Sequence, residues 1–238
     1  MKICIDPGHG GWDPGAVSGV RREKDYTLRL GLRVAQIVTD QGHEAVLTRS
    51  ADVSLGSTEA LDLAARCKIA SGCGAMLSIH LNSAVAVATG LEVLFETENN
   101  RSLAQAVLSE ILKVAPAIDR KVKVQKLGAL PNGGRAVLAE MGFINNPADV
   151  KMLEAHFEQY CQALVRGLFK GLGLEWKEEE DDMVRYEKIE DVPADWGRDT
   201  IQKLIDKDLL AVPDDGKIDI SRDMLRVLVI NDRMGLYN

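Results

Sequence analysis

The sequence predicts an α/β fold, in which a mixed, mostly parallel sheet carries helices on both faces and a small, mainly helical domain follows. Short apolar runs ending at glycine, proline or polar residues alternate with segments whose apolar residues recur every three or four positions. Strands separated by helices need crossover connections, which favour parallel pairing and cover both faces of a sheet. A charge-dense segment from residue 176 ends this alternation.

The first half of the chain gives three expected strands and two expected helices. KICID at 2–6 is an apolar run stopped by Pro7 and Gly8, and the strands EAVLT at 44–48 and AMLSIH at 75–80 follow. A helix over 25–41 is predicted by the spacing of its apolar residues, with Gly42 as its stop. A second helix, marked by 61–69, has Thr58 as its expected cap.

The next hundred residues continue the pattern. GLEVLFET at 90–97 and RAVLAEMGF at 135–143 are expected strands, and 103–114 is an expected helix. A last helix carries apolar residues from Leu153 to Leu172 and is closed by glycines. We therefore expect a main domain over 1–175, a charged linker over 176–193 and a small C-terminal domain over 194–238.

Composition excludes several classes of protein. The 238 residues carry a net charge of -7, which gives no electrostatic footprint for nucleic acid. No apolar run approaches the roughly 18 residues that a membrane span needs. The four cysteines have no CxxC spacing and are expected to be free thiols. No basic-then-apolar leader precedes the first strand, so we expect synthesis in the cytoplasm without a signal peptide.

Polar side chains with metal-binding chemistry stand at the ends of the expected strands. His9 follows the first strand, Glu23 precedes the first helix, and His80 ends the third strand. Carboxyl ends of adjacent parallel strands converge on one crevice, and two imidazoles with one carboxylate form a recurring catalytic zinc set. Glu140 closes a further strand inside an apolar run, where burying a carboxylate costs free energy. A role as a base beside a zinc site would explain why it is there. The alternative is that such histidines are ordinary polar strand ends.

Five motifs occur in one order over roughly residues 1–174: DPGHGGWDPGA, REKDYTLRLGLRVAQIV, VLTRSAD, LSIHLNS and AVLAEMGFINNPADV. Together they resemble the zinc-dependent N-acetylmuramoyl-L-alanine amidases of bacterial autolysins and phage endolysins. The resemblance implies that His9, Glu23 and His80 bind Zn²⁺, that Glu140 is catalytic and that Asn82 lies in the substrate groove. It gives Arg49 and Arg66 a structural role, bridging loops near the site.

The implied function is peptidoglycan hydrolysis at the amide between the lactyl group of N-acetylmuramic acid and L-alanine of the stem peptide. The expected lack of a signal peptide favours a phage or prophage endolysin, which degrades the wall and lyses the cell after holin-type release. A cytoplasmic or spore-stage wall hydrolase is an alternative setting. Alternative activities are a zinc carboxypeptidase or deacetylase, or a non-catalytic wall-binding protein on the same scaffold.

Two further features leave alternatives open. The C-terminal segment, with Trp196, an I-x-x-L helix and a second helix capped by Ser221, resembles one S-layer homology repeat. We expect it to bind a wall polymer or to self-associate into a homo-oligomer. Trp12, in the first glycine-rich loop, is placed either to stack against sugar or to pack over the metal loop.

Overall fold

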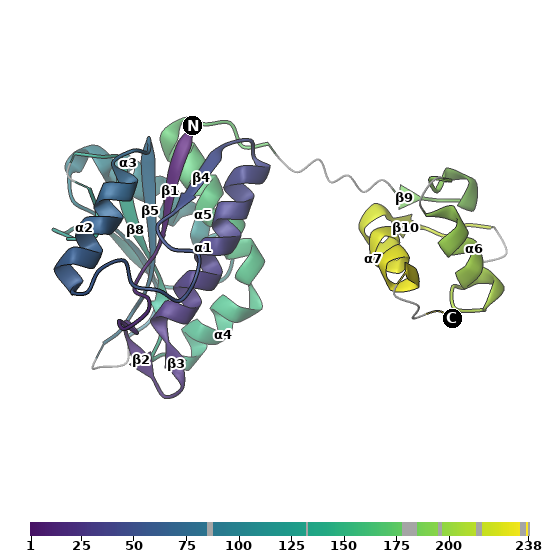
Figure 1. Cartoon of the computed structure of the whole chain (residues 1–238), viewed down its shortest axis with the longest axis horizontal. Coiled ribbons are helices and arrows are strands. Elements are labelled where there is room, and N and C mark those ends of the chain that lie inside the picture. Colours follow the sequence, from purple (N-terminus) through teal and green to yellow (C-terminus); the bar gives the residue numbers. More distant parts are fainter. Residues whose placement is uncertain are drawn as a thin grey trace. The chain divides into compact units, whose positions relative to one another are not determined.

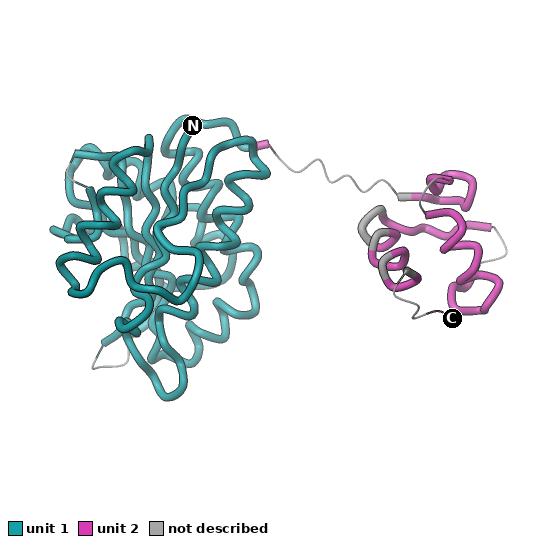
Figure 2. The backbone as a smooth tube through the Cα atoms, viewed as in Figure 1, with its two compact units in different colours: residues 1–176 teal, residues 177–238 magenta. Residues whose placement is uncertain are grey.

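The chain folds as two compact units, residues 1–176 and 177–238, which are coloured separately in Figure 2. The computed structural model describes residues 1–84, 88–131, 133–177, 185–194, 197–212, 216–233 and 237. Each unit is described by itself.

The first unit is built on a six-stranded sheet with the order β4-β1-β5-β8-β6-β7. The four strands β4, β1, β5 and β8 pair in parallel, β6 pairs antiparallel with β8, and β7 pairs in parallel with β6. The predicted mixed, mostly parallel sheet is therefore confirmed. The strands are β1 (Lys2–Pro7), β4 (Glu44–Leu47), β5 (Ala75–Asn82), β6 (Leu91–Phe95), β7 (Asp119–Val124) and β8 (Ala136–Phe143).

Helices cover both faces of this sheet, as predicted (Figure 1). On one face α1 (Glu23–Asp40), α3 (Arg101–Ile111) and α5 (Phe157–Leu172) pack against the larger core, which includes Ile5 and Leu77. On the other face α2 (Glu59–Ala70) helps to cover Cys4 and Met76. Successive strand residues point to opposite faces, so two covered faces require the continuous apolar runs seen in the sequence.

Local signals fix where several helices begin and end. The hydroxyl of Thr58 accepts a hydrogen bond from the Leu61 N–H at 3.3 Å, which confirms the predicted cap of α2. Asn146 caps α4 (Pro147–Ala155) by accepting from the N–H groups of Ala148 and Asp149. A proline in the first turn suits this start, because its missing N–H would have no helical partner there.

The predicted last helix over 153–172 is wrong as a single element. It is two helices, α4 and α5, because His156 between them has φ -118° and ψ 28°, outside the helical region. The apolar spacing continues across the break, with Leu153 and Leu164 both in the core, so periodicity did not reveal it.

Strand β7 and a short hairpin before α1 in the first unit were not predicted, nor was the two-stranded sheet of the second unit. Strand β7 has the sequence DRKVKV, in which charged residues dominate, and it lies at the edge of the sheet. Charged side chains are typical of edge strands, but they leave little apolar signal. The short hairpin of β2 (Val17–Ser18) and β3 (Arg21–Arg22) lies directly before α1 and likewise has no apolar run.

The second unit is small and mainly helical, as predicted. Helices α6 (Arg198–Asp206) and α7 (Arg222–Arg233) accompany a two-stranded sheet of β9 (Arg185–Tyr186) and β10 (Ile220–Ser221) and a short 3-10 turn, Ile189–Asp191. Ser221 accepts a hydrogen bond from the Met224 N–H at 3.2 Å, which confirms its capping role. Among the described residues, the core includes Tyr186, Val192, Ile201, Leu204, Ile218, Ile220, Leu225 and Val229.

The predicted linker over 176–193 differs from the structure at its far end. Tyr186 and Val192 are buried in the second core, so residues 185–193 belong to the folded unit rather than to a solvated hinge. The charge of the segment hid these two apolar positions. Residues 178–184 lie outside the described residues, as do Trp196 and residues 214–215 of the expected turn.

Two expectations from composition also have structural counterparts. Each helix within the described residues is too short or too polar to cross a membrane. All four cysteines are free, and Cys4 and Cys161 are buried. Burial raises the pKa of the Cys161 thiol to about 12, so it remains protonated at neutral pH.

The close contact between α3 and α5 generates the first prediction. A Cβ atom added at Gly167 would lie 2.5 Å from the Cα of Val107, so the backbone of one of the two helices would have to shift. We expect Gly167→Ala to lower the free energy of unfolding by about 1–3 kcal/mol, the usual cost of overpacking. The midpoint of urea unfolding measures this. Gly72→Ala is the matched control, because its nearest atom is the Ile69 carbonyl oxygen at 3.7 Å; equal midpoints for the two variants would contradict the argument.

Candidate functional site

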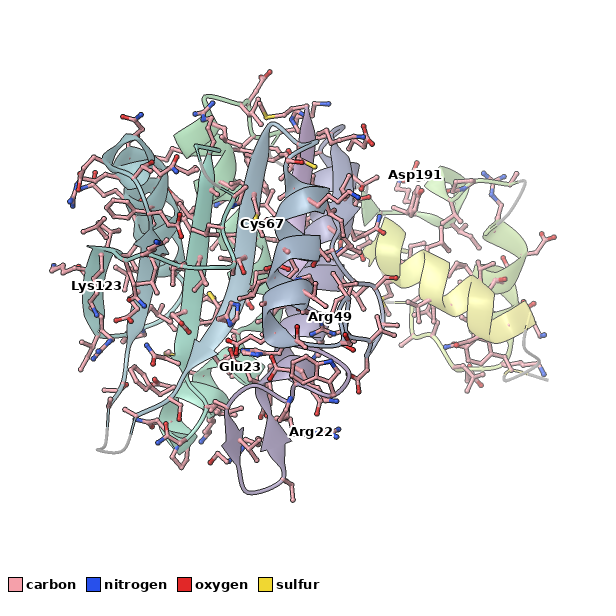
Figure 3. The ribbon with its side chains drawn as sticks, turned by 60° about the vertical axis from the view of Figure 1, so that its left-hand side comes forward. Arg22, Glu23, Arg49, Cys67, Lys123 and Asp191 are labelled. Atoms are coloured by element: carbon pink, nitrogen blue, oxygen red, sulfur yellow. The ribbon has the colours of Figure 1, made fainter. Side chains whose placement is uncertain are left out.

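The predicted site residues come together at the carboxyl ends of the parallel strands β1, β5 and β8. His9 follows β1, His80 lies near the end of β5, and Glu140 on β8 is paired in register with His80. Glu23 is the first residue of α1. Figure 3 shows Glu23 at this end of the sheet, with Arg49 nearby. The parallel order β1-β5-β8 is what brings these distant parts of the sequence into one crevice.

The Glu23 carboxylate joins the two histidines. Its Oε1 lies 3.1 Å from Nε2 of His9 and 2.9 Å from Nδ1 of His80. The same carboxylate accepts hydrogen bonds from the N–H groups of Leu81 and Ala16, each at 2.9 Å. These contacts fix a buried carboxylate between two imidazoles, and the rings of the histidines meet edge to face with centroids 4.8 Å apart.

The glycine-rich loop after β1 has a steric reason for its composition. A Cβ atom at position 8 would lie 2.3 Å from the imidazole of His80, so only glycine leaves room for that ring. His9 itself has φ 62°, in the left-handed region that few non-glycine residues adopt. Such a conformation persists only where surrounding contacts hold it, and it turns the His9 side chain toward Glu23.

Two buried arginines supply those contacts. Arg49 donates from Nε to the Pro7 carbonyl at 3.0 Å and from Nη2 to the Gly8 carbonyl at 2.9 Å. Arg66 donates from Nη2 to the His9 carbonyl at 2.6 Å. Both side chains therefore bind the backbone of the loop, which confirms the predicted structural role. Arg66 also lines the cavity that holds His9 and His80.

Asp13 is a site residue that the sequence analysis missed. Its Oδ2 lies 2.7 Å from Nδ1 of His9. A carboxylate on one ring nitrogen fixes the tautomer and orientation of a ligating histidine and leaves the other nitrogen available. The available signal was an aspartate four residues after the histidine, within the same loop.

The cluster is strongly polarised. Burial lowers the proton affinity of His9, but hydrogen bonds and charge from Glu23 and Asp13 outweigh it and raise the pKa of His9 to about 9. Burial opposes ionisation of Glu23, yet hydrogen bonds from His80 and His9 hold the pKa of Glu23 far below its usual range. A carboxylate that stays ionised between two imidazoles can hold a cation once His9 gives up its proton, because a ligating imidazole must be neutral.

The donor set fits a zinc ion. One donor atom from each of His9, Glu23 and His80 lies within 4.8 Å of the others, and two imidazoles with one carboxylate are a catalytic zinc set. Tetrahedral bonds of about 2.0–2.1 Å place neighbouring ligand atoms about 3.3 Å apart, close to the spacings of Glu23 Oε1 from both histidines. Because Asp13 occupies Nδ1 of His9, the facing Nε2 is the donor that remains.

Glu140, a half-buried acid, lies beside this cluster. Its Oε2 is buried and has no hydrogen-bond partner. Burial raises the pKa of Glu140 to about 7, with nearby charge from His80 opposing the shift and that from Glu23 and Glu92 adding to it. A carboxyl group with a free oxygen and a pKa near neutrality is suited to take up and release a proton.

Asn82 is tied into a network that the sequence analysis also missed. Its amide Nδ2 donates to Oε1 of Glu92 on β6 at 2.9 Å. Glu92, which faces Glu140 in the register of β6 and β8, also receives Arg120 at 2.8 Å and Lys123 from β7. The groove role of Asn82 stays a prediction, and its amide here joins β5 to β6.

Comparisons with known proteins agree with this geometry. Residues 3–171 match the family model described as N-acetylmuramoyl-L-alanine amidase. The chain is 32% identical over 180 residues to the sporulation-specific N-acetylmuramoyl-L-alanine amidase of Bacillus subtilis, covering 72% of this chain and 67% of the relative. It is 30% identical over 185 residues to the germination-specific amidase of the same organism, covering 71% and 77%.

A solved structure shares the fold. The CwlD amidase from Clostridioides difficile, determined in complex with the GerS lipoprotein, superposes with a TM-score of 0.68 at 28% identity. The match covers 73% of this chain and 99% of that one. The shared part corresponds in extent to the first unit.

The metal cluster generates the second prediction. We expect His9→Ala and His80→Ala each to lose most of the zinc that the wild-type chain takes up, because each removes one of three protein donors. Metal content after dialysis, measured by plasma mass spectrometry, tests this. His156→Gln removes a histidine outside the cluster and should keep wild-type content; full zinc content in His80→Ala would contradict the assignment.

Proposed function

The chain belongs to the N-acetylmuramoyl-L-alanine amidase family, and we propose that it hydrolyses the amide between the lactyl group of N-acetylmuramic acid and L-alanine in peptidoglycan. The observation that supports this most directly is Glu140, a half-buried acid beside the His9, Glu23 and His80 cluster whose buried Oε2 has no hydrogen-bond partner. A reaction that moves one proton from a nucleophile to a leaving group needs such an acid.

His9, Glu23 and His80 would hold one zinc ion. When bound, zinc supplies Lewis acidity, which makes a water molecule more acidic and polarises a carbonyl group. The residues around the three donors keep them in place: Asp13 orients His9, and the Leu81 N–H orients Glu23. Preformed donors need little reorganisation, which favours catalysis at a rigid site.

Glu140 would carry the proton. Its ionised carboxylate would accept a proton from the attacking water, while the water oxygen forms a bond to the lactyl carbonyl carbon and the carbonyl π electrons move to its oxygen. The same carboxyl group would then donate that proton to the alanine nitrogen as the carbonyl re-forms and the C–N bond breaks. A pKa raised to about 7 allows Glu140 to perform both transfers near neutral pH.

The alternative activities have less support. A zinc carboxypeptidase or deacetylase could use the same donor set, but the family match over residues 3–171 favours the muramoyl amide. A non-catalytic wall-binding protein would have no use for Glu140, which is costly to bury without a role. Retention of all three donors beside it favours an enzyme.

The setting in which the enzyme acts has two candidates. A phage or prophage endolysin released through a holin-type lesion stays a prediction from the sequence. The two Bacillus subtilis relatives are named as sporulation-specific and germination-specific, which favours the spore-stage alternative. Either setting places the substrate in the cell wall.

The second unit would add affinity for the wall, by binding a wall polymer or by self-association. It leaves apolar side chains of Leu209, Met224 and Val227 exposed. A single copy offers one binding surface, and joining copies would raise the effective affinity for a polymer without new contacts.

Glu140→Gln is the third prediction. We expect the rate of amide hydrolysis to fall about 10²–10⁴-fold, the usual contribution of a general base, with unchanged zinc content. Mass spectrometry of digested peptidoglycan, which detects stems with free N-terminal alanine and intact glycan, measures the product. Glu98→Gln changes an exposed glutamate and should keep full activity. Wild-type rates in Glu140→Gln with zinc bound would exclude the proton role.

Truncation after residue 176 is the fourth prediction. Trp176 packs edge to face on Phe169 of the first core, so this end point preserves the first unit. We expect the truncated chain to hydrolyse soluble muramoyl peptides at the full rate and to lose pelleting with cell walls. Light scattering would identify self-association as the cause if the number of chains per particle fell on truncation. Unchanged pelleting would contradict both roles of the second unit.

A further inference from the structure

Trp12 is an exposed aromatic side chain at the edge of the proposed catalytic site. It lies in the loop between His9 and Asp13 and is 51% exposed. It lines the same cavity as His9 and His80, together with Glu59. None of the steps argued above uses this ring.

The indole is held in a fixed orientation. Its Nε1 donates a hydrogen bond to the Gly56 carbonyl at 2.9 Å, across to the loop before α2. The two loops are joined a second time by Asp52, which accepts from the Gly11 N–H and from Lys24 Nζ, both at 2.8 Å. The ring is therefore preorganised, and binding a ligand would cost little ordering entropy.

The fixed ring offers one kind of chemistry. Because its N–H is already bonded to Gly56, what remains for a ligand is the apolar face of the indole. The exposed carboxylate of Glu59, in the same cavity, is a hydrogen-bond acceptor. A flat apolar face beside an acceptor matches a pyranose ring, which presents C–H groups on its faces and hydroxyl donors at its rim.

We propose that Trp12 forms a sugar subsite, on which a pyranose ring of the glycan strand stacks while Glu59 accepts a hydroxyl hydrogen bond. This inference rests on the proposed function, because the reacting carbonyl is joined to the muramoyl ring by a short lactyl ether. A carbonyl placed between the metal cluster and Glu140 therefore keeps its sugar within reach of the cavity that His9 shares with Trp12. Packing over the metal loop alone would not require a ring that is half exposed.

Binding of a sugar without a peptide tests the subsite directly. Chitotetraose, a β-1,4-linked tetramer of N-acetylglucosamine, is titrated into the zinc-loaded chain and followed by saturation-transfer NMR of the sugar protons. We expect the wild type to bind, Trp12→Phe to bind a few-fold more weakly, and Trp12→Leu to bind at least about tenfold more weakly. Leucine keeps apolar bulk but removes the aromatic face. Val20→Ser, at an exposed side chain outside the cavity, should bind as the wild type does.

Hydrolysis of two matched substrates gives a second readout. One is an N-acetylmuramoyl peptide, and the other is the lactoyl peptide with the same stem but without the sugar ring. Trp12→Leu should lower kcat/KM about tenfold through KM on the first substrate and leave the second unchanged. Trp12→Leu also loses the hydrogen bond to Gly56, so unchanged zinc content together with the wild-type rate on the lactoyl peptide is what excludes a disrupted loop.

The outcomes separate this inference from the proposed function. Equal losses on both substrates, or chitotetraose binding that is unaffected in Trp12→Leu, would overturn the sugar subsite. Trp12-dependent binding of chitotetraose by a chain that does not cleave the muramoyl amide would support the subsite and reject the proposed reaction. Cleavage of the amide with no dependence on Trp12 would do the reverse.

Discussion

The buried carboxylate of Asp6 is the interaction on which the site depends. It is fully buried on β1 and accepts hydrogen bonds from Thr48 and Ser78, each at 2.6 Å, and from Arg66 at 2.7 Å. Thr48 follows β4, Ser78 lies on β5 and Arg66 lies on α2, so one carboxylate ties four segments together. Breaking such a pair from one side typically costs about 3–5 kcal/mol, since it leaves an unpaired buried charge. The buried hydrogen bonds of Asp6 therefore fix how β1, β5, α2 and the segment after β4 lie relative to one another.

The contacts of Asp6 also position the backbone that carries the metal-binding residues. Arg66, held by Asp6, also binds the His9 carbonyl and so supports a residue in the left-handed region. Arg49 binds the carbonyls of Pro7 and Gly8, the two residues before His9. The loop cannot rearrange without breaking hydrogen bonds from both buried guanidinium groups, which costs free energy at each donor that is left unsatisfied. A metal centre on this loop needs no ordering of its own backbone, which is why sharp placement of His9 coexists with a glycine-rich sequence.

The sequence predicts the features that depend on burial or on strand ends. It does not predict the features that depend on how strands pair in the sheet. The strands through Cys4, Leu77 and Val137 were evident because both faces of the sheet are covered, which requires unbroken apolar runs. His9 and His80 followed from their places at strand ends, Glu23 from its place before the first helix, and all three from the family motifs. Strand β7 was missed because it pairs only with β6 and lies at the edge of the sheet, where charged residues dominate its composition.

The network around Glu92 shows why register is beyond sequence reasoning. Glu92 faces Glu140 only because β6 pairs antiparallel with β8, and a shift of one residue would turn its side chain to the other face. Two buried acids side by side would repel, and the cations of Arg120 and Lys123 neutralise Glu92 alone. That asymmetry holds the pKa of Glu92 below its ordinary value while that of Glu140 rises to about 7. The edge strand without an apolar signal thus helps to set one acid apart as the proton carrier.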